Sequence, residues 1–347
     1  MVRQNKPKLL EKFPEEAVLL AVDAGASKID AALVGTDGSV LAAVRHHAYA
    51  NFNFGHEPPL DALGEAIRRV ASKAGVSRDS QPVARTGLFC LAGADLPLDD
   101  RRIARQVKSR GWVGEVLLRN DTFAILRAGT DHGWGVAVVC GSGLNCAGIG
   151  PDGRVVRFAA LGELSGDLAH GGGWLGRAAL GVALRARDGR GPRTELETLV
   201  AQHFGMKRPE AVMEALYTQA LDPQRMLELA PVVFEAEARG DGESRRLITM
   251  LADEIVTTAN AAIRRLRITR RPFDVVLGGG IFRSRDGLLM SRVREGITAV
   301  APEAKLKRLD APPVLGAALL GLDATKARPA AKERVKRELA KTRLGRR

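Results

Sequence analysis

A strand–turn–strand pattern occurs twice in the chain, and this repetition constrains the fold more than any other feature of the sequence. An apolar run ends in a glycine turn at Gly25, and a second apolar run does the same at Gly141. Each turn is followed by another strand-like segment that ends in an Asp-Gly turn, at Asp37 and at Asp152. The repeat distance is 116 residues at the glycine turns and 115 at the Asp-Gly turns. Such self-similarity predicts a duplicated unit, although two unrelated hairpins would also contain common Asp-Gly turns.

Strand-like and helix-like segments alternate within both copies. Each copy opens with three short apolar segments and continues into amphipathic helical patterns with further strands. This order predicts an α/β protein of two βββαβα units, with additional helical sequence inside the second unit. The expected parts are an N-terminal extension at 1–16, a first domain at 17–130, a second domain with a helical insertion at 131–323 and a basic tail at 324–347.

The length and composition agree with a two-domain enzyme. The chain has 347 residues, 45% of them hydrophobic, which is enough to bury two cores. No apolar run reaches the ~18 residues that a transmembrane helix needs. The first residues are charged and lack the apolar segment and cleavage site of a signal peptide. We therefore expect a cytoplasmic protein that does not contact a membrane.

The positive charge of the chain is concentrated at its end. The net charge is +13, and residues 324–347 supply +8 of it with ten Lys/Arg against two Glu. This tail is either a solvated, partly helical extension or an arm that binds polyanions. The tail lacks the aromatic side chains on which nucleotides stack, so we favour the first interpretation and do not expect a nucleic-acid partner.

The first glycine turn has the sequence DAGASK and follows a buried strand. Gly25 allows φ > 0 and close approach of a ligand, and the N–H groups of Ala26 and Ser27 belong to a turn of the anion-binding type. Lys28 adds a positive charge, and Asp23 could hold a Mg²⁺ ion through a water molecule. An ordinary hairpin turn would explain the same residues equally well.

The second glycine turn, CGSGLNC, also lies between two strands. Gly141, Ser142 and Gly143 form no Walker loop, because no helix-opening G-K-[ST] follows them. Cys140 and Cys146 are too few ligands for a zinc or iron–sulfur site, so we expect them to be buried small residues.

A third glycine-rich turn, VVLGGGIF, follows a late apolar strand. Three glycines would let a nucleotide pack flat against the backbone. Together the three turns predict a nucleotide held in a cleft between the two domains.

Asp121 lies at a strand-to-helix junction just before the second copy begins. A carboxylate there could accept the proton of a hydroxyl that attacks the γ-phosphate of ATP. An Asn or Asp at this position is also a common helix N-cap. Position alone does not decide between the two roles.

Two polar loops could bind a sugar. The loop YANFNFG, with Asn51, offers amides and aromatic faces, although an Asn-capped turn accounts for it as well. The loop LGELSGD, with Gly162 and Asp167, is followed by His170 and three glycines in a place typical of binding loops. His170 by itself reads as an ordinary loop histidine.

These segments, in this order, resemble the N-acetylglucosamine kinase group of the BadF/BadG/BcrA/BcrD-type ATPases. The resemblance covers residues 17–323 and rests on AVDAGASK, RNDTFA, VCGSGLNCAGIGPDG, LGELSGD and VVLGGGIF. It implies an actin/hexokinase-like fold of ribonuclease H-like units, with ATP and Mg²⁺ in the interdomain cleft. One difference is that Asp167 is followed by Leu168-Ala169-His170 and three glycines, where the family usually has Glu-Gly-Ser.

The resemblance also implies roles for individual residues. ATP would contact the first phosphate loop at Gly25 and Ser27, the second at Gly141, Ser142 and Gly143, and the adenosine-flanking glycines Gly279 and Gly280. Asp121 would be the catalytic base. The sugar would contact Asn51, Asn145 and Asp167, with the Gly162 segment alongside.

The leading hypothesis is a kinase that phosphorylates O6 of N-acetylglucosamine or of a related amino sugar, such as glucosamine or N-acetylmuramic acid. Two alternatives are an ATPase activator of a dehydratase or reductase, and a non-catalytic sugar-sensing regulator. Cys90, Cys140 and Cys146 do not form the pattern that an activator needs to bridge an iron–sulfur cluster. The expected partner is a small sugar, and a homodimer stays open.

Overall fold

The computed structural model of the chain divides it into two compact units. It describes residues 17–25, 27–48, 52, 59–76, 82–284, 286–342 and 344. Unit 1 comprises Met1–Gly133 and Leu309–Arg347, and unit 2 comprises Trp134–Arg308.

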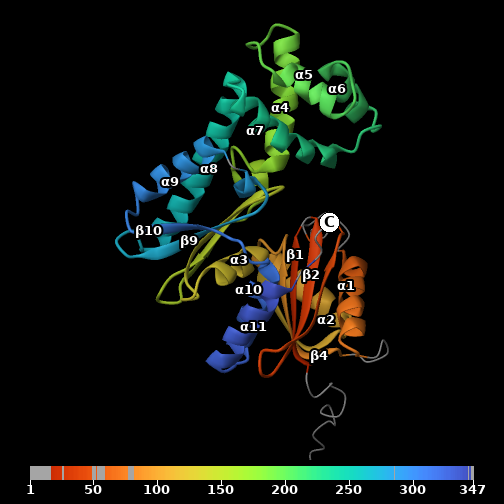
Figure 1. The fold of residues 1–347 in the computed structure, drawn as a ribbon, viewed down its shortest axis with the longest axis vertical. Helices are drawn as coiled ribbons and strands as arrows, with labels where there is room; N and C mark the ends of the chain where they lie inside the picture. The colour runs from red at the N-terminus through yellow and green to blue at the C-terminus, as the bar shows by residue number, and fades with distance from the viewer. Residues whose placement is uncertain are drawn as a thin grey trace, which may run out of the picture. The chain divides into compact units, whose positions relative to one another are not determined.

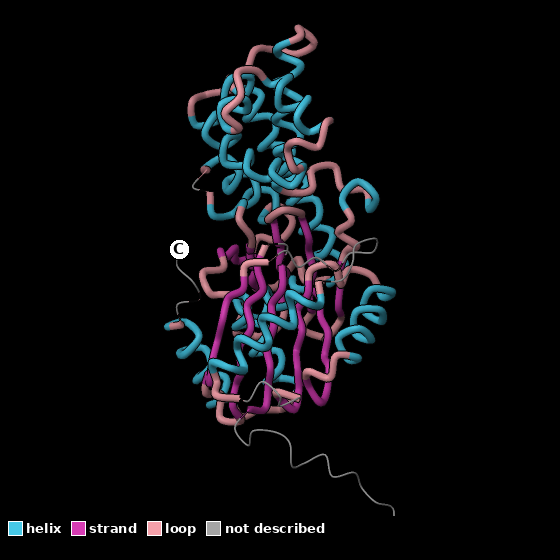
Figure 2. Tube along the Cα trace, turned by 90° about the vertical axis from the view of Figure 1, so that its right-hand side faces the viewer, coloured by secondary structure: helices cyan, strands magenta, loops and turns pink. Residues whose placement is uncertain are grey.

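Unit 1 is built on a five-stranded mixed sheet in the order β3-β2-β1-β4-β5 (Figures 1 and 2). Its strands are β1 (Ala17–Gly25), β2 (Lys28–Gly35), β3 (Val40–His46), β4 (Ala84–Leu91) and β5 (Val113–Asn120). The first three strands are antiparallel, whereas β4 and β5 run parallel to β1. The carboxyl ends of β1, β4 and β5 therefore meet at one edge of the sheet.

Both faces of this sheet are covered by helices. Along β1, alternate side chains point to opposite faces, so Leu20 and Val22 join one apolar core and Leu19 and Ala21 join another. The first core contains α1 (Leu60–Lys73) and α2 (Pro97–Ser109). The second contains α3 (Asp121–Gly129), α10 (Pro313–Ala324) and α11 (Pro329–Lys341). Figure 1 shows α1 on one side of the sheet and α10 with α11 on the other.

The C-terminal part of the chain returns to unit 1, which differs from the expected boundaries. The second domain was expected to extend to residue 323, but the chain from Leu309 onward belongs to unit 1. The cause is the packing of α10, which is apolar on most of its surface and lies against β1 and α3. Gly316 permits this approach, because a Cβ atom there would lie 1.8 Å from the carbonyl oxygen of Ala124.

Unit 2 has a sheet of the same design, in the order β10-β9-β6-β7-β8. Its strands are β6 (Gly135–Cys140), β7 (Leu144–Ile149), β8 (Val155–Arg157), β9 (Phe273–Gly278) and β10 (Ala304–Arg308). Here too the first three strands are antiparallel, and β9 and β10 run parallel to β6. The strand order matches that of unit 1 strand by strand, which confirms the duplication.

The helical insertion of unit 2 lies between β8 and β9. Its helices are α4 (Gly172–Arg187), α5 (Leu196–His203), α6 (Pro209–Tyr217), α7 (Ala230–Ala238) and α8 (Gly242–Leu266), and α9 (Gly287–Thr298) follows β9. Short 3₁₀ turns lie at η1 (Gly162–Ser165), η2 (Pro223–Leu229) and η3 (Ile281–Arg283). Leu251, Ile255 and Ile263 of the long helix α8 are buried in a core shared with β6, β7 and β9. Among the described residues, no helix is both long enough and apolar enough to cross a membrane.

Candidate functional site

The unit 1 site begins with a row of polar residues across the sheet. Strand pairing places Arg45 beside Asp30, Asp30 beside Asp23, Asp23 beside Cys90, and Cys90 beside Arg119. Directly paired residues project to the same face of a sheet. Asp23 is only 5% exposed and lies near the carboxyl end of β1. The row therefore brings two buried carboxylates, Asp23 and Asp30, to the edge where the parallel strands end.

Asp30 organises the positive charges next to Asp23. The Arg45 guanidinium donates two hydrogen bonds of 2.7 Å to the Asp30 carboxylate, and Lys28 Nζ donates a third of 3.0 Å. The ammonium group of Lys28 is thus bound to a side chain of its own sheet. Sequence reasoning missed Asp30 and Arg45, although an aspartate inside the otherwise apolar strand β2 was a usable signal, since buried carboxylates need partners.

The structure separates the two roles that were open for Asp121. The N-cap of α3 is Asn120, whose Oδ1 accepts the N–H of Thr122 at 3.0 Å. Asn120 Nδ2 also donates to Asp95 Oδ1 at 2.8 Å, which ties the helix start to the loop after β4. Because Asn120 is the cap, Asp121 is the first residue of the helix itself, and its carboxylate is half-buried.

The negative charge of Asp121 contributes to a raised pKa at the buried Asp23 carboxyl group. Burial raises the pKa of Asp121 to about 6, and this effect outweighs the hydrogen bonds from backbone N–H groups, which lower the pKa. Burial also raises the pKa of Asp23 to about 8, and the negative charges of Asp30 and Asp121 add to this, while Lys28 and Arg45 act against it. The edge of unit 1 therefore holds two neighbouring carboxyl groups with raised pKa values, a common property of catalytic sites.

In unit 2 the second glycine turn packs against the start of helix α4. The N–H groups of Gly172 and Gly173 donate to the carbonyl oxygens of Gly141 and Ser142 at 2.8 and 2.9 Å. Gly171 has φ +96°, and a Cβ atom there would lie 2.5 Å from the carbonyl group of Gly143. Gly171 and Gly172 are thus required by close backbone-to-backbone contacts with the second glycine turn.

Replacing Gly171 by alanine is expected to displace the second glycine turn and to weaken nucleotide binding. The added Cβ atom meets rigid backbone at 2.5 Å, and alanine also resists a positive φ at a cost of roughly 1 kcal/mol. The measurement is nucleotide affinity by calorimetry. Gly166→Ala is the matched control, because Gly166 has φ +87° but no described atom within 4 Å of its Cβ position. Equal losses in the two variants would contradict the packing argument.

The third glycine turn lies beside the second. Gly278 at the end of β9 pairs with Val139 of β6. Gly279 has φ +102°, and a Cβ atom there would lie 2.2 Å from the carbonyl oxygen of Cys140. Gly280 instead has a Cβ position with no described atom within 4 Å. The turn is followed by the 3₁₀ turn η3, and α9 begins only at Gly287.

Several other turn glycines have open space at the position where a Cβ atom would lie. For Gly25, Gly141 and Gly143, no described atom lies within 4 Å of the Cβ position. Gly25 does not have a positive φ, so its turn does not use the left-handed conformation that glycine allows. Open backbone of this kind is what close approach of a ligand requires. Ser27 and Ser142 are exposed in these same turns.

The structure brings Gly162 and Asp167 together in one loop of unit 2. The N–H of Asp167 donates to the carbonyl oxygen of Gly162 at 3.2 Å, and Ser165 Oγ donates to Asp167 Oδ2 at 2.8 Å. Burial raises the pKa of Glu254 on α8, and the negative charge of Asp167 contributes. Sequence reasoning missed Glu254, because a lone glutamate in a helical pattern carries no signal of its own.

The structure describes some of the remaining predicted site residues and leaves two of them undescribed. Asn145 lies in β7 opposite Val139. Burial lowers the pKa of His170, and the positive charge of Arg177 contributes. Cys140 and Cys146 are buried in the apolar core of unit 2, as expected. Two of the predicted contact residues, Ala26 and Asn51, lie outside the described residues.

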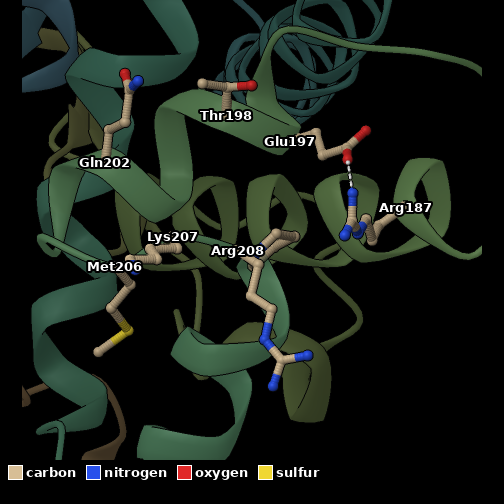
Figure 3. Close-up of a pocket in the computed structure, with 8 residues that line it drawn as sticks. Arg187, Glu197, Thr198, Gln202, Met206, Lys207 and Arg208 are labelled. Carbon is tan, nitrogen blue, oxygen red and sulfur yellow. Dashed lines mark hydrogen bonds and ion pairs between the residues drawn. The ribbon is translucent and has the colours of Figure 1, made fainter.

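A hollow of about 320 Å³ lies in the helical insertion of unit 2 (Figure 3). Its lining residues come from α4 to α6 and the loop before α6: Arg187, Glu197, Thr198, Gln202, Met206, Lys207, Arg208 and Pro209. Two of these residues, Arg187 and Glu197, form an ion pair of 3.2 Å. No residue of the predicted site lines this hollow, and we assign it no role.

The two duplicated five-stranded sheets define a protein of the actin/hexokinase-like fold class. The chain belongs to the BadF/BadG/BcrA/BcrD ATPase family, whose model matches residues 20–321. This result confirms the resemblance and the fold class that the sequence motifs predicted.

Two curated relatives and one solved structure are similar to this chain over nearly their whole length. The chain is 26% identical over 322 residues to an N-acetyl-D-glucosamine kinase of Dictyostelium discoideum, covering 89% of this chain and 99% of that protein. It is 25% identical over 308 residues to an N-acetylmuramic acid/N-acetylglucosamine kinase of Clostridium acetobutylicum, covering 87% and 97%. A crystal structure from Chromobacterium violaceum, provisionally assigned as an N-acetylglucosamine kinase, has a TM-score of 0.67 at 24% identity, covering 88% and 99%.

Proposed function

We propose that this protein is an ATP-dependent sugar kinase that transfers the γ-phosphate of ATP to O6 of N-acetylglucosamine or a related amino sugar. The observation that carries the proposal is Asp121, a half-buried carboxylate at the start of a helix capped by Asn120. The membership of the ATPase family and the two kinase relatives support the reaction class. Both relatives act on N-acetylglucosamine by name, and this supports the choice of sugar.

In this proposal Asp121 is the general base. It accepts the proton of the sugar hydroxyl as the oxygen attacks the γ-phosphate. A pKa of about 6 leaves the carboxylate mainly ionised near neutral pH yet basic enough to take a proton. Asn120, held by Asp95, keeps the base at the first position of α3.

The glycine turns bind ATP in this proposal. In unit 1, Gly25, Ser27 and Lys28 contact phosphate oxygens, with Ala26 in the same turn. In unit 2, Gly141, Ser142 and Gly143 do so, and Gly279 and Gly280 flank the adenosine. Open backbone at most of these glycines supports the assignment, because N–H groups in such turns bind anions.

Asp23 and its surroundings fit a magnesium ion held through water. Mg²⁺ keeps several waters and takes one or two carboxylates together with substrate phosphates. Asp23 is a buried carboxylate near the carboxyl end of β1, and it would hold the ion through a water molecule. When bound, the ion would neutralise charge on the β- and γ-phosphates.

The sugar side of the proposal rests on Asn145, Gly162, Asp167 and Asn51. Asp167 and Gly162 share one hydrogen-bonded loop, so they can act on one ligand. A carboxylate and an amide offer the acceptors and donors that sugar hydroxyls require.

A panel of sugars tests the proposed reaction. ADP release is expected to be saturable with N-acetylglucosamine and to be weaker or absent with glucose. The product should carry phosphate on O6, seen as phosphorus coupling to carbon 6 by NMR. The 6-deoxy analogue is the matched control, since it should bind and inhibit without turnover. If no amino sugar raised ADP release above the level without sugar, the proposal would be wrong.

A further inference from the structure

The basic C-terminal segment forms a helix that the family model does not cover. The family match ends at residue 321, and α11 follows at Pro329–Lys341. Val335 and Leu339 of this helix are fully buried in the apolar core beneath the unit 1 sheet. The expectation of a solvated extension is therefore wrong for this part of the tail.

One face of α11 holds the hairpin between β2 and β3. Gly38 has φ +81°, and a Cβ atom there would lie 2.0 Å from the carbonyl oxygen of Ala331, so the turn and the helix touch backbone to backbone. Arg334 forms an ion pair with Asp37 in the same turn. Glu338 Oε2 accepts the N–H of Val40 at 2.7 Å, which satisfies a backbone donor at the start of β3.

The other contacts of α11 reach helix α3 through a shared carboxylate. Lys332 Nζ lies 2.5 Å from Asp323 Oδ1, and Arg127 Nε of α3 lies 2.8 Å from Asp323 Oδ2. Arg127 is buried and also donates to the carbonyl oxygen of Thr130 at 3.2 Å, just beyond the end of α3. Lys336 pairs with Asp131 at 2.9 Å. Lys332 and Lys336 of α11 are thus paired with acidic groups around the C-terminal end of α3.

We propose that α11 is an intramolecular brace that holds the helix carrying Asp121, with Arg127 and Asp323 as positioning residues. Helix α3 has only nine residues, so a change of direction at its end also moves its first residue. Three of the basic side chains, Lys332, Arg334 and Lys336, bind acidic partners of unit 1. Because these side chains are paired, fewer unpaired positive charges remain on α11 to bind a polyanion. Polyanion binding is the competing interpretation of the tail.

The test compares Asp323→Asn and Lys332→Gln with Arg337→Gln. Arg337 is exposed on the same helix, and the described residues include no partner for it, so its variant removes one charge without removing a brace contact. In Asp323→Asn, amide hydrogen exchange in α3 is expected to become faster. In the same variant kcat should fall between about tenfold and about a hundredfold, the order of effect of a small misplacement, with the KM for ATP unchanged. Lys332→Gln should show the same changes to a smaller extent.

Two results would overturn the brace. The first is unchanged hydrogen exchange in α3 for Asp323→Asn and Lys332→Gln. The second is a rise in KM for ATP with an unchanged kcat. Equal loss of heparin binding in Lys332→Gln and Arg337→Gln, with no change in α3, would establish the polyanion arm instead. The kinetic part rests on the proposed kinase function, whereas hydrogen exchange needs no activity. Loss of the proposed function would therefore leave the exchange result interpretable.

Discussion

Replacing Asp121 by asparagine is expected to reduce sugar-dependent ADP release by about 10²–10⁴-fold, the usual contribution of a general base. Asparagine has nearly the same shape but cannot accept the proton. Helix α3 should persist, because its N-cap is Asn120. The measurement is kcat together with ATP affinity by calorimetry, and ATP affinity should stay close to that of the unaltered protein.

The pH dependence gives an independent check on this role. Because the pKa of Asp121 is about 6, turnover should fall as the pH is lowered through this value, where the base becomes protonated. The residual activity of Asp121→Asn should lack this acid limb. A raised pKa in the folded protein means that ionisation of Asp121 costs stability as the pH rises. The variant should therefore be at least as stable at neutral pH.

Asp61→Asn is a suitable control for the loss of a carboxylate. The Asp61 side chain is 97% exposed and has only a 3.6 Å contact with Arg110. Its variant should keep both the turnover and the acid limb. Normal turnover in Asp121→Asn would rule out the general-base role, even if sugar and ATP still bound.

Replacing Gly316 by alanine is expected to destabilise unit 1 by about 1–3 kcal/mol, the usual cost of overpacking a core. The new Cβ atom would lie 1.8 Å from the carbonyl oxygen of Ala124, and backbone cannot rotate away as a side chain can. Helices α10 and α3 would have to separate. Since Ala124 lies three residues after Asp121, turnover should fall as well. Chemical denaturation and kcat measure the two effects.

Gly181→Ala is the matched control for this substitution. Gly181 lies inside helix α4, and no described atom is found within 4 Å of its Cβ position. Alanine should there be neutral or should stabilise by up to about 1 kcal/mol, because it loses less conformational freedom on folding. Equal destabilisation by both substitutions would contradict the close packing of α10 on α3.

The local pattern of the sequence was sufficient for the fold class and for most elements of the two sheets. Strands such as β1 and β6 are short apolar runs that end in glycine turns, and this signal depends only on neighbouring residues. The duplication was visible for the same reason, because both copies repeat the same turns. The motif residues Asp23, Asp121 and Gly141 could be named in advance, since their chemistry and their places at strand ends are local properties.

Other features depended on contacts between distant parts of the chain. The return of α10 to unit 1 and the docking of α11 follow from apolar faces whose partners the sequence does not name. Asn120 caps α3 and also donates a hydrogen bond to Asp95, a residue 25 positions earlier in the chain that the local pattern does not name.

Three glycines show most directly which features can be read from the sequence and which need the tertiary structure. The sequence has glycine at Gly25, Gly171 and Gly316, but the local pattern does not show why each position needs a glycine. Only the tertiary structure shows that Gly25 leaves open space, while Gly171 and Gly316 each touch the backbone of another segment. The physical reason is that the space left by a missing Cβ atom can be filled by a ligand or by a neighbouring backbone segment. Which of the two is possible depends on what lies nearby in space, and neighbours in the sequence do not reveal this.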